Sequence, residues 1–210
     1  NMCFGKVPSK EVIKAFDVSM TLYAEHSFNA STFTSRVITS SLSDMHGAVT
    51  GAIASLKGPL HGGANEAVAH MLNQVGSPDK AEQFILNKIK NKELIMGFGH
   101  RVYRNGDSRV PTMTEYYHKT AEFYQNKKLP EISKILEETM LREKKIKPNL
   151  DFPAGPTYYL MGFDIDFFTP IFIVSRITGW AAHVMEQFDT NKLIRPLSKY
   201  IGAPHRKIEK

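Results

Sequence analysis

Apolar residues recur along most of this chain at intervals of three and four, which is the spacing of amphipathic helices. In the first run, Val12, Phe16, Met20 and Tyr23 follow Ser9, a residue type that caps helix N-termini. Further helices are expected over residues 29–41, 44–57, 65–74, 77–90, 112–126, 130–143 and 169–187. The sequence has no alternating strand pattern of useful length and no visible internal repeat. The pattern therefore predicts an all-α protein.

Segments rich in Gly or Pro separate these helices, and three of them each present one ionisable side chain. His61 lies in Gly58–Gly63, His100 follows Gly97–Gly99, and Asp151 lies in a proline-containing stretch that we expect to be irregular. Tight loops let a substrate approach the backbone, because glycine removes side-chain bulk. Two imidazoles and one carboxylate form a minimal set for general acid–base catalysis. His61, His100 and Asp151 are therefore candidate catalytic residues.

Other interpretations of the same residues stay open at this point. A chain with eight histidines places some of them near glycine by chance, and such histidines are usually turn or surface residues. Two histidines and a carboxylate can also hold a metal ion in a hydrolase, although short ligand spacings such as His-x-His or His-Glu-x-x-His are absent. Gly97-Phe98-Gly99 is only a fragment of a dinucleotide fingerprint and follows no predicted strand, so a Rossmann site is not expected.

Arginine is the second recurring feature of the sequence. Arg176 lies in the most apolar predicted helix, where burial of a guanidinium is costly unless an anion pairs with it. Ser175 beside it keeps a solvated surface position open as the alternative. A planar guanidinium can bind a carboxylate through two hydrogen bonds, so several arginines indicate a substrate with more than one carboxylate. The others near the candidate loops or near the chain's end are Arg101, Arg104, Arg109 and Arg195.

The composition narrows the classes of partner. The formal charge of +6 suits nucleic acid or an anionic small molecule, but the basic residues are scattered and lack the aromatic interleaving of nucleic-acid binders. No apolar run reaches the roughly 18 residues of a membrane span. Cys3 is the only cysteine, so no intrachain disulfide is possible and a reducing, cytoplasmic location is expected. We therefore expect neither a nucleic-acid partner nor a membrane partner.

Six segments of the chain together resemble the citrate synthase family, in the family's order and over essentially the whole chain. They are Ala24–Phe33, Gly58–Asn65, Met96–Arg104 with Asp107 and Arg109, Asn149–Phe152, Phe172–Arg176 and Leu193–Pro196. The resemblance implies an all-α fold in which a small helical domain is inserted into a large one. Residues 1–60 are then expected in the large domain, 61–160 in the small domain, and 161–210 in the final large-domain helix and tail. The high charge density from Lys80 to Lys147 agrees with a more solvated inserted domain.

The same resemblance implies an acyltransferase that condenses an acyl-CoA with oxaloacetate. Asp151 would remove an α-proton from the acyl group, His61 would hydrogen-bond the thioester oxygen, and His100 would protonate the oxaloacetate carbonyl. Neither a metal nor another cofactor is implied, since acyl-CoA is a substrate. The oxaloacetate-binding residues would be His26, Arg109, Phe172, Arg176 and Arg195, the last reaching the active site of the partner subunit in a homodimer. The CoA-binding residues would be Gly58, Leu60, Gly97, Phe98, Gly99 and Arg104.

Two questions remain open within the resemblance. The run Phe-Pro-Ala-Gly-Pro after Asp151 looks closer to bacterial 2-methylcitrate synthases of the methylcitrate cycle, which use propionyl-CoA, than to citrate synthases of the tricarboxylic acid cycle, which use acetyl-CoA. One methylene is worth only about 1–3 kcal/mol of discrimination, so small differences in a pocket decide the acyl group. Family members also carry an N-terminal half of the large domain that this chain lacks. We expect a fragment of a longer enzyme; the alternative is a catalytically inactive substrate-binding or interaction fragment.

Overall fold

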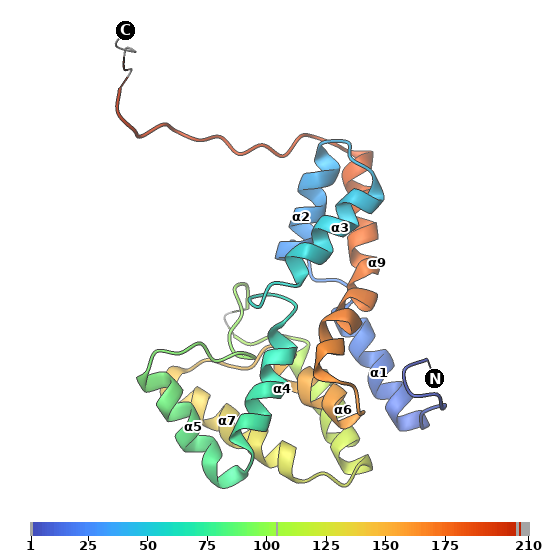
Figure 1. The fold of residues 1–210 in the computed structure, drawn as a ribbon, viewed down its shortest axis with the longest axis vertical. Coiled ribbons are helices and arrows are strands. Elements are labelled where there is room, and N and C mark those ends of the chain that lie inside the picture. Colours follow the sequence, from blue (N-terminus) through green and yellow to red (C-terminus); the bar gives the residue numbers. More distant parts are fainter. Residues whose placement is uncertain (1, 104, 205, 207–210) are drawn as a thin grey trace.

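The computed structural model describes residues 2–103, 105–204 and 206, and their regular structure is helical (Figure 1). The elements are α1 (Lys10–Tyr23), α2 (Ala30–Ser40), α3 (Met45–Leu56), α4 (Ala64–Val75), α5 (Pro78–Lys90), α6 (Val110–Phe123), α7 (Lys128–Lys144), α8 (Asp151–Leu160), the short 3-10 helix η1 (Ile165–Phe167) and α9 (Phe168–Asp189). The only β-type pairing in this part of the chain is one isolated antiparallel bridge between Phe98 and Pro148. The all-α prediction is confirmed.

Helix starts follow the capping residues seen in the sequence. Ser9, Asn29 and Asp44 each precede a helix, and each side chain accepts a hydrogen bond from the backbone N–H three residues further on. Ser77 occupies the N-cap of α5 and Pro78 lies at the start of that helix, but the Ser77 side chain makes no capping hydrogen bond. Local sequence chemistry therefore sets these boundaries before any tertiary contact is considered.

Helix α8 corrects one expectation, because the stretch around Asp151 is not irregular. The helix begins at Asp151 itself. Pro153 lies in the first helical turn, where a backbone N–H has no intrahelical acceptor, so proline is tolerated there. Pro156 lies inside the helix and removes one hydrogen bond. Burial of almost every side chain from Phe152 to Tyr158 between neighbouring helices compensates, so tertiary packing outweighs the helix-breaking residues.

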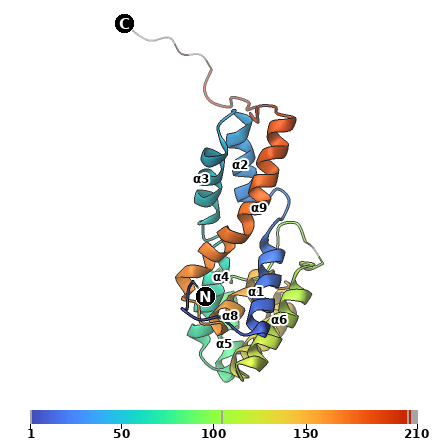
Figure 2. The same ribbon diagram turned by 90° about the vertical axis from the view of Figure 1, so that its right-hand side faces the viewer.

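The helices form an elongated molecule with two connected parts (Figures 1 and 2). Helices α2 and α3 pack with the C-terminal half of α9 in the upper part, and α9 continues down into a body that contains α1 and α4–α8. One apolar cluster joins α1, α8 and α9 through buried residues such as Tyr23, Tyr158 and Trp180. A second cluster joins α4, α5 and α7 through residues such as Val68 and Leu136. Helix α8 lies between them, because its residues contribute to both clusters.

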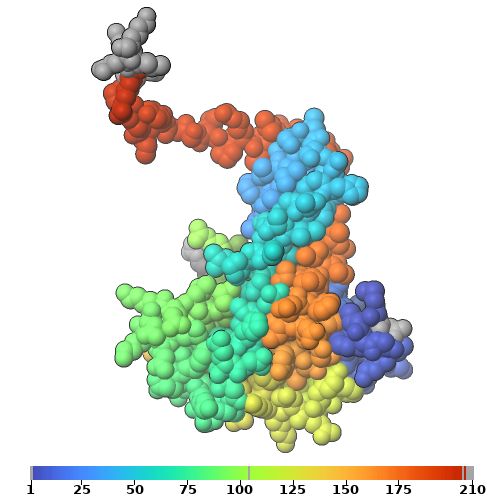
Figure 3. All heavy atoms as spheres, viewed as in Figure 1, coloured from blue at the N-terminus to red at the C-terminus, as the bar shows by residue number. Residues whose placement is uncertain are grey.

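The chain after α9 leaves the helical body. Residues from 191 to 204 carry no regular secondary structure and are mostly exposed, and Figure 3 shows this tail running away from the α2–α3–α9 end. In the part of the chain that the structure describes, no helix is long and apolar enough to cross a membrane. The domain boundaries expected near residues 60 and 160 stay predictions.

Gly179→Ala should destabilise the protein, because α9 passes very close to the segment that follows α1. A Cβ at Gly179 would collide with the carbonyl oxygen of Ala24 and lie 3.2 Å from the Cα of Glu25. Overpacking of this kind costs about 1–3 kcal/mol, although alanine gains about 1 kcal/mol over glycine in helix propensity. We expect urea unfolding to give a lower free energy of unfolding for this variant than for the wild type.

Ala182→Gly is the matched control for that measurement. Ala182 is an exposed residue of the same helix, so its replacement reports the propensity difference alone, a loss of about 1 kcal/mol. A Gly179→Ala variant as stable as the wild type would show that the segment after α1 yields without cost.

Candidate active site

The residues of the candidate site come from opposite ends of the chain and meet where the two parts of the molecule join. Phe172 of α9 links them: its ring centroid lies 4.2 Å from that of Tyr23 and 6.0 Å from that of His61. Tyr23 in turn reaches the carboxylate of Asp151, with 2.6 Å between its Oη and Oδ1. His61 and Asp151, 90 positions apart in sequence, are thus connected through two aromatic residues.

Asp151 is the first residue of α8, and its surroundings raise its pKa above that of an ordinary aspartate. Its backbone N–H donates to Asn149 Oδ1 at 3.1 Å, and its Oδ1 accepts the Tyr23 hydrogen bond. Burial raises the pKa of Asp151 to about 6, against the lowering effects of the Tyr23 hydroxyl and of Arg109 and Arg176. The carboxylate is therefore ionised at neutral pH with a proton affinity well suited to a general base.

The contacts of His61 define where its proton lies. Its Nε2 faces the backbone N–H of Ser31 at 3.3 Å and the Ser31 hydroxyl at 2.8 Å. A backbone N–H can only donate, so Nε2 accepts and the neutral ring carries its proton on Nδ1. Burial, together with the charge of Arg176, lowers the pKa of His61 to about 4. The ring is therefore neutral at pH 7 and presents an Nδ1–H donor.

His100 carries its proton on the opposite ring nitrogen. Its Nδ1 accepts hydrogen bonds from the backbone N–H groups of Val102 (3.1 Å) and Tyr103 (3.3 Å), which leaves the proton on Nε2. That nitrogen lies 3.0 Å from Nε2 of His26, which must act as the acceptor. Burial lowers the pKa of both rings, that of His26 to about 4. His100 is thus a neutral donor whose proton is held by His26 in this structure.

Two backbone hydrogen bonds tie the His100 loop to the approach to α8. Gly99 N–H donates to the Lys147 carbonyl at 2.9 Å, and Asn149 N–H donates to the Gly97 carbonyl at 2.9 Å. The side-chain amide of Asn149 also donates to the Gly99 carbonyl at 2.9 Å. Gly97 and Gly99 adopt φ values of +84° and +79°, which favour glycine. The His100 loop (Gly97–Gly99) and the segment before α8 (Lys147–Asn149) therefore form one short β-type ladder.

Asp107 orients Arg109 and is itself fully buried. Its two carboxylate oxygens accept hydrogen bonds from Nε (2.9 Å) and Nη2 (2.7 Å) of Arg109, and Oδ2 also accepts the N–H of Leu150 at 3.2 Å. Burial opposes ionisation, but the Arg109 hydrogen bonds hold the pKa of Asp107 below its usual value. The ion pair therefore fixes a guanidinium beside the first turn of α8.

Arg176 is buried, with 1% of its surface exposed, so the solvated alternative for this residue is wrong. Its Nε donates to the carbonyl of Tyr23 at 2.6 Å, and its guanidinium lies over the ring of Phe172 at 4.7 Å. Its Nη1 has no hydrogen-bond acceptor within residues 2–103, 105–204 and 206. Burial lowers the pKa of Arg176 to about 10, which still leaves it charged at neutral pH. A donor left unpaired on a buried cation makes Arg176 a candidate anion-binding residue.

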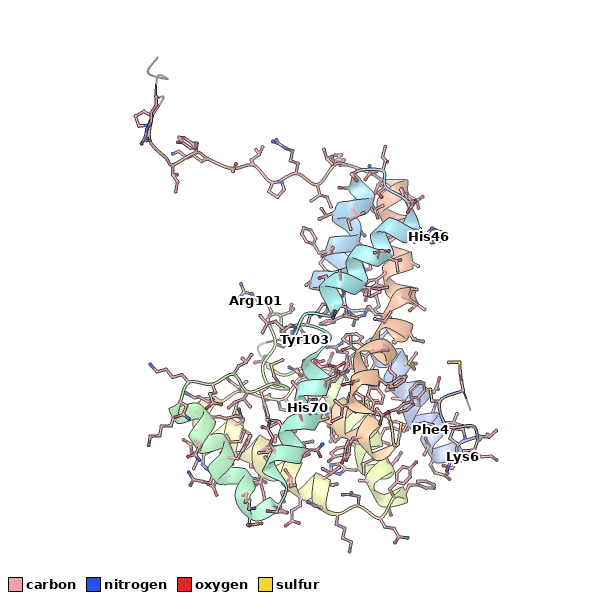
Figure 4. All side chains as sticks on the ribbon, viewed as in Figure 1. Phe4, Lys6, His46, His70, Arg101 and Tyr103 are labelled. Atoms are coloured by element: carbon pink, nitrogen blue, oxygen red, sulfur yellow. The ribbon has the colours of Figure 1, made fainter. Side chains whose placement is uncertain are left out.

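The residues expected to bind CoA lie on the His61 loop and on the His100 loop. Gly58 and the exposed Leu60 belong to the His61 loop, and Gly97–Gly99 belong to the other; Arg104 lies outside the described residues. Figure 4 places Arg101 and Tyr103 on the chain that follows His100, with Arg101 projecting outward. A cavity of about 290 Å³ opens beside this chain, and its lining includes Gly99, His100, Tyr103, Lys145 and Lys147.

Arg195 is not brought to the site by this chain. It lies in the exposed tail after α9, so its expected role in the partner subunit's site stays a prediction. Within the described part of the chain, no group of three His, Cys, Asp or Glu side chains is placed to hold a metal ion. The sequence did not single out Tyr23 and Ser31, because both occupy ordinary positions of predicted helices. A buried tyrosine needs an acceptor for its hydroxyl, but the residues near Tyr23 in sequence do not show that the acceptor is Asp151, 128 positions away.

Comparisons with known proteins match almost the whole chain. The family model for the C-terminal domain of citrate synthase matches residues 1–197. A citrate synthase from Mycolicibacterium smegmatis is 57% identical over 208 residues, which cover 99% of this chain and 56% of that protein. A 2-methylcitrate synthase from Mycobacterium tuberculosis H37Rv is 57% identical over 206 residues, which cover 98% of this chain and 52% of that protein. The chain spans about half the length of the curated relatives it matches.

A solved structure has the same fold over the whole chain. It is a ternary complex of citrate synthase from Thermoplasma acidophilum with carboxymethyl coenzyme A and oxaloacetate, with a TM-score of 0.92 and 36% identity. The match covers 100% of this chain and 57% of that one.

Proposed function

Since this chain belongs to the citrate synthase family, we propose that the protein condenses an acyl-CoA with oxaloacetate and releases free CoA. The observation that carries the proposal is the pair of neutral imidazoles with oppositely placed protons, His61 on Nδ1 and His100 on Nε2, near a carboxylate whose pKa is about 6. Such a set supplies one base and two separate donors, which is what a carbon–carbon condensation of this class requires.

In the first step, Asp151 takes a proton from the carbon next to the thioester. That proton is weakly acidic, so the developing negative charge on the thioester oxygen needs a donor already in place. The Nδ1–H of His61 is suited to this role, because Ser31 fixes the opposite ring nitrogen as an acceptor. The step moves one proton to the Asp151 carboxylate and leaves an enol or enolate bound to the His61 donor.

In the second step, the enol carbon attacks the ketone carbon of oxaloacetate. The new alkoxide receives the Nε2 proton of His100, so the ketone oxygen would replace His26 as the acceptor of that hydrogen bond. The free donors of Arg176, together with Arg109, would bind the carboxylates. Water then attacks the thioester carbon and gives one proton back to His100. The C–S bond breaks and the Asp151 proton goes to the CoA thiolate, which gives a tricarboxylate, free CoA and one proton released to solvent. No step uses a metal or another cofactor.

The acyl group proposed is propionyl, which would make the protein a 2-methylcitrate synthase of the methylcitrate cycle. The support is the run from Phe152 to Pro156 after the candidate base, which lies buried in α8. Proteins named citrate synthase and 2-methylcitrate synthase are equally similar to this chain, at 57% identity, so overall likeness does not separate the two. We also propose a cytoplasmic homodimer in which Arg195 completes the site of the partner subunit.

The test is thiol release followed with a disulfide reagent in the complete protein. We expect release from propionyl-CoA only when oxaloacetate is present, unchanged by EDTA, and a higher kcat/KM for propionyl-CoA than for acetyl-CoA. A higher kcat/KM for acetyl-CoA would overturn the acyl choice alone. In the 210-residue chain tested alone, oxaloacetate binding without thiol release would favour the catalytically inactive binding fragment. Oxaloacetate-independent release by the complete protein would defeat the condensation.

A further inference from the structure

Tyr23 ends α1 and buries its phenol against the candidate base. Its side chain is 1% exposed, and its Oη lies 2.6 Å from Oδ1 of Asp151, 128 positions later in the chain. Burial raises the pKa of Tyr23 well above that of an ordinary tyrosine, so the phenol keeps its proton throughout the physiological range. The hydroxyl is therefore the donor and the carboxylate the acceptor, in a short charge-assisted hydrogen bond.

The same residue is fixed from its other side. Its carbonyl oxygen accepts the Nε–H of Arg176 at 2.6 Å, and its ring packs against Phe172. Tyr23 therefore cannot move without disturbing the arginine proposed to bind substrate. Asp151, unlike Tyr23, is partly exposed, and its Oδ2 makes no hydrogen bond to the described residues. One carboxylate oxygen is held by the phenol and the other is left for a substrate.

We propose that Tyr23 is a positioning residue for the condensation, which holds Oδ1 of Asp151 so that Oδ2 receives the proton from the acyl group. The inference rests on the proposed function. Its second effect is on ionisation: a hydrogen-bond donor to a half-buried carboxylate favours the charged form, which is the form that acts as base. Without the hydroxyl, burial would act on Asp151 with less opposition, and more of the carboxylate would be protonated at neutral pH.

Tyr23→Phe tests the inference, because it removes the hydroxyl and keeps the ring that packs on Phe172. We expect the acid limb of kcat/KM against pH to move up by about one pH unit from its wild-type midpoint near 6. Activity at pH 5.5 should then fall about five- to tenfold, while activity at pH 9 stays within about threefold of the wild type. A residue with only a packing role would lower activity by the same factor at every pH.

Tyr158→Phe is the matched control. Tyr158 is also fully buried in the same apolar cluster, but its hydroxyl donates to Ser19 Oγ at 3.0 Å rather than to Asp151. This variant should lose stability and leave the acid limb where it is. Equal pH shifts in both variants, or none in Tyr23→Phe, would overturn the inference.

A second measurement separates this inference from the proposed function. The ¹³C carboxyl resonance of Asp151, identified by its loss in Asp151→Asn, reports the ionisation of that residue without turnover. We expect its titration midpoint to rise in Tyr23→Phe and to stay unchanged in Tyr158→Phe. A wild-type protein without condensation activity but with this shift would refute the proposed function and the catalytic part of the inference. An active wild type in which the midpoint does not move would refute the role of Tyr23 alone.

Discussion

Asp151→Asn is expected to lower kcat for CoA release by about a thousandfold or more while making the folded protein more stable at pH 8. General base catalysis contributes about 10²–10⁴-fold, and an amide cannot accept the α-proton. The amide oxygen can still accept the Tyr23 hydrogen bond, so the local packing should persist. The comparison to make is single-turnover thiol release by the two proteins at the same pH.

The stability half of this prediction follows from the sign of the pKa shift. Burial raises the pKa of Asp151 to about 6 from an ordinary value of 3.8, so the folded state binds the proton more tightly than the unfolded state. Folding stability attributable to this group is therefore full below about pH 4 and is lost as the pH rises through 6. The loss amounts to about 3 kcal/mol at pH 8, and asparagine should recover most of it.

Urea unfolding at pH 8 and at pH 4 checks this expectation. Asp151→Asn should exceed the wild type in free energy of unfolding at pH 8 and match it at pH 4. Asp107→Asn is the control with the opposite sign, because Arg109 holds the pKa of Asp107 below its usual value. That variant should be less stable than the wild type at pH 8. If Asp151→Asn proves equally destabilising at both pH values, burial of the charge is not the dominant effect.

Arg176→Met is expected to raise the dissociation constant for oxaloacetate by at least about a hundredfold with little or no loss of stability. The guanidinium is buried and one of its nitrogens has no acceptor in the described part of the chain, so the free protein bears an incompletely compensated charge. A methionine fills similar apolar space over Phe172 and removes that burden, although it leaves the Tyr23 carbonyl without its hydrogen bond. Loss of a two-point charge-assisted contact to a carboxylate accounts for the weaker binding.

A thermal unfolding series with increasing oxaloacetate separates the two effects. The wild-type Tm should rise with oxaloacetate concentration, and the Tm of Arg176→Met should not. Arg36→Met is the matched control, because Arg36 is a largely buried arginine of α2 that is paired with Glu186 and with the His183 carbonyl. It should lower the Tm and leave the oxaloacetate-dependent rise intact. An unchanged rise in Arg176→Met would remove this residue from the substrate site.

Most helices here can be predicted from the sequence, because each helix start depends on residues only a few positions away in the chain. Ser9, Asn29 and Asp44 cap their helices through contacts only three residues away, and apolar spacing extends each helix from there. Helix α8 was missed for the opposite reason: its prolines disfavour a helix locally, and only the packing of its buried side chains stabilises it. Rules about local conformation cannot weigh such burial.

The candidate site divides in the same way. Glycine and the surrounding motif marked the loops of His61 and His100 from the sequence alone. Two distant partners of these rings were not predicted from the sequence, because Ser31 lies 30 positions from His61 and His26 lies 74 positions from His100. Arg176 was ambiguous between a solvated and a buried position, and only its burial in the folded structure decided between them.

The ladder between Gly97–Gly99 and Lys147–Asn149 has a consequence for how the site comes apart. The amide protons of Gly99 and Asn149 are held by two hydrogen bonds that flank the same bridge between Phe98 and Pro148, so we expect both to be exposed to solvent when that bridge opens. The two amides should therefore show one common opening free energy in hydrogen–deuterium exchange. Local unfolding would release the His100 loop and the start of α8 together. Heat or denaturant should therefore disrupt the site in one cooperative transition and not gradually.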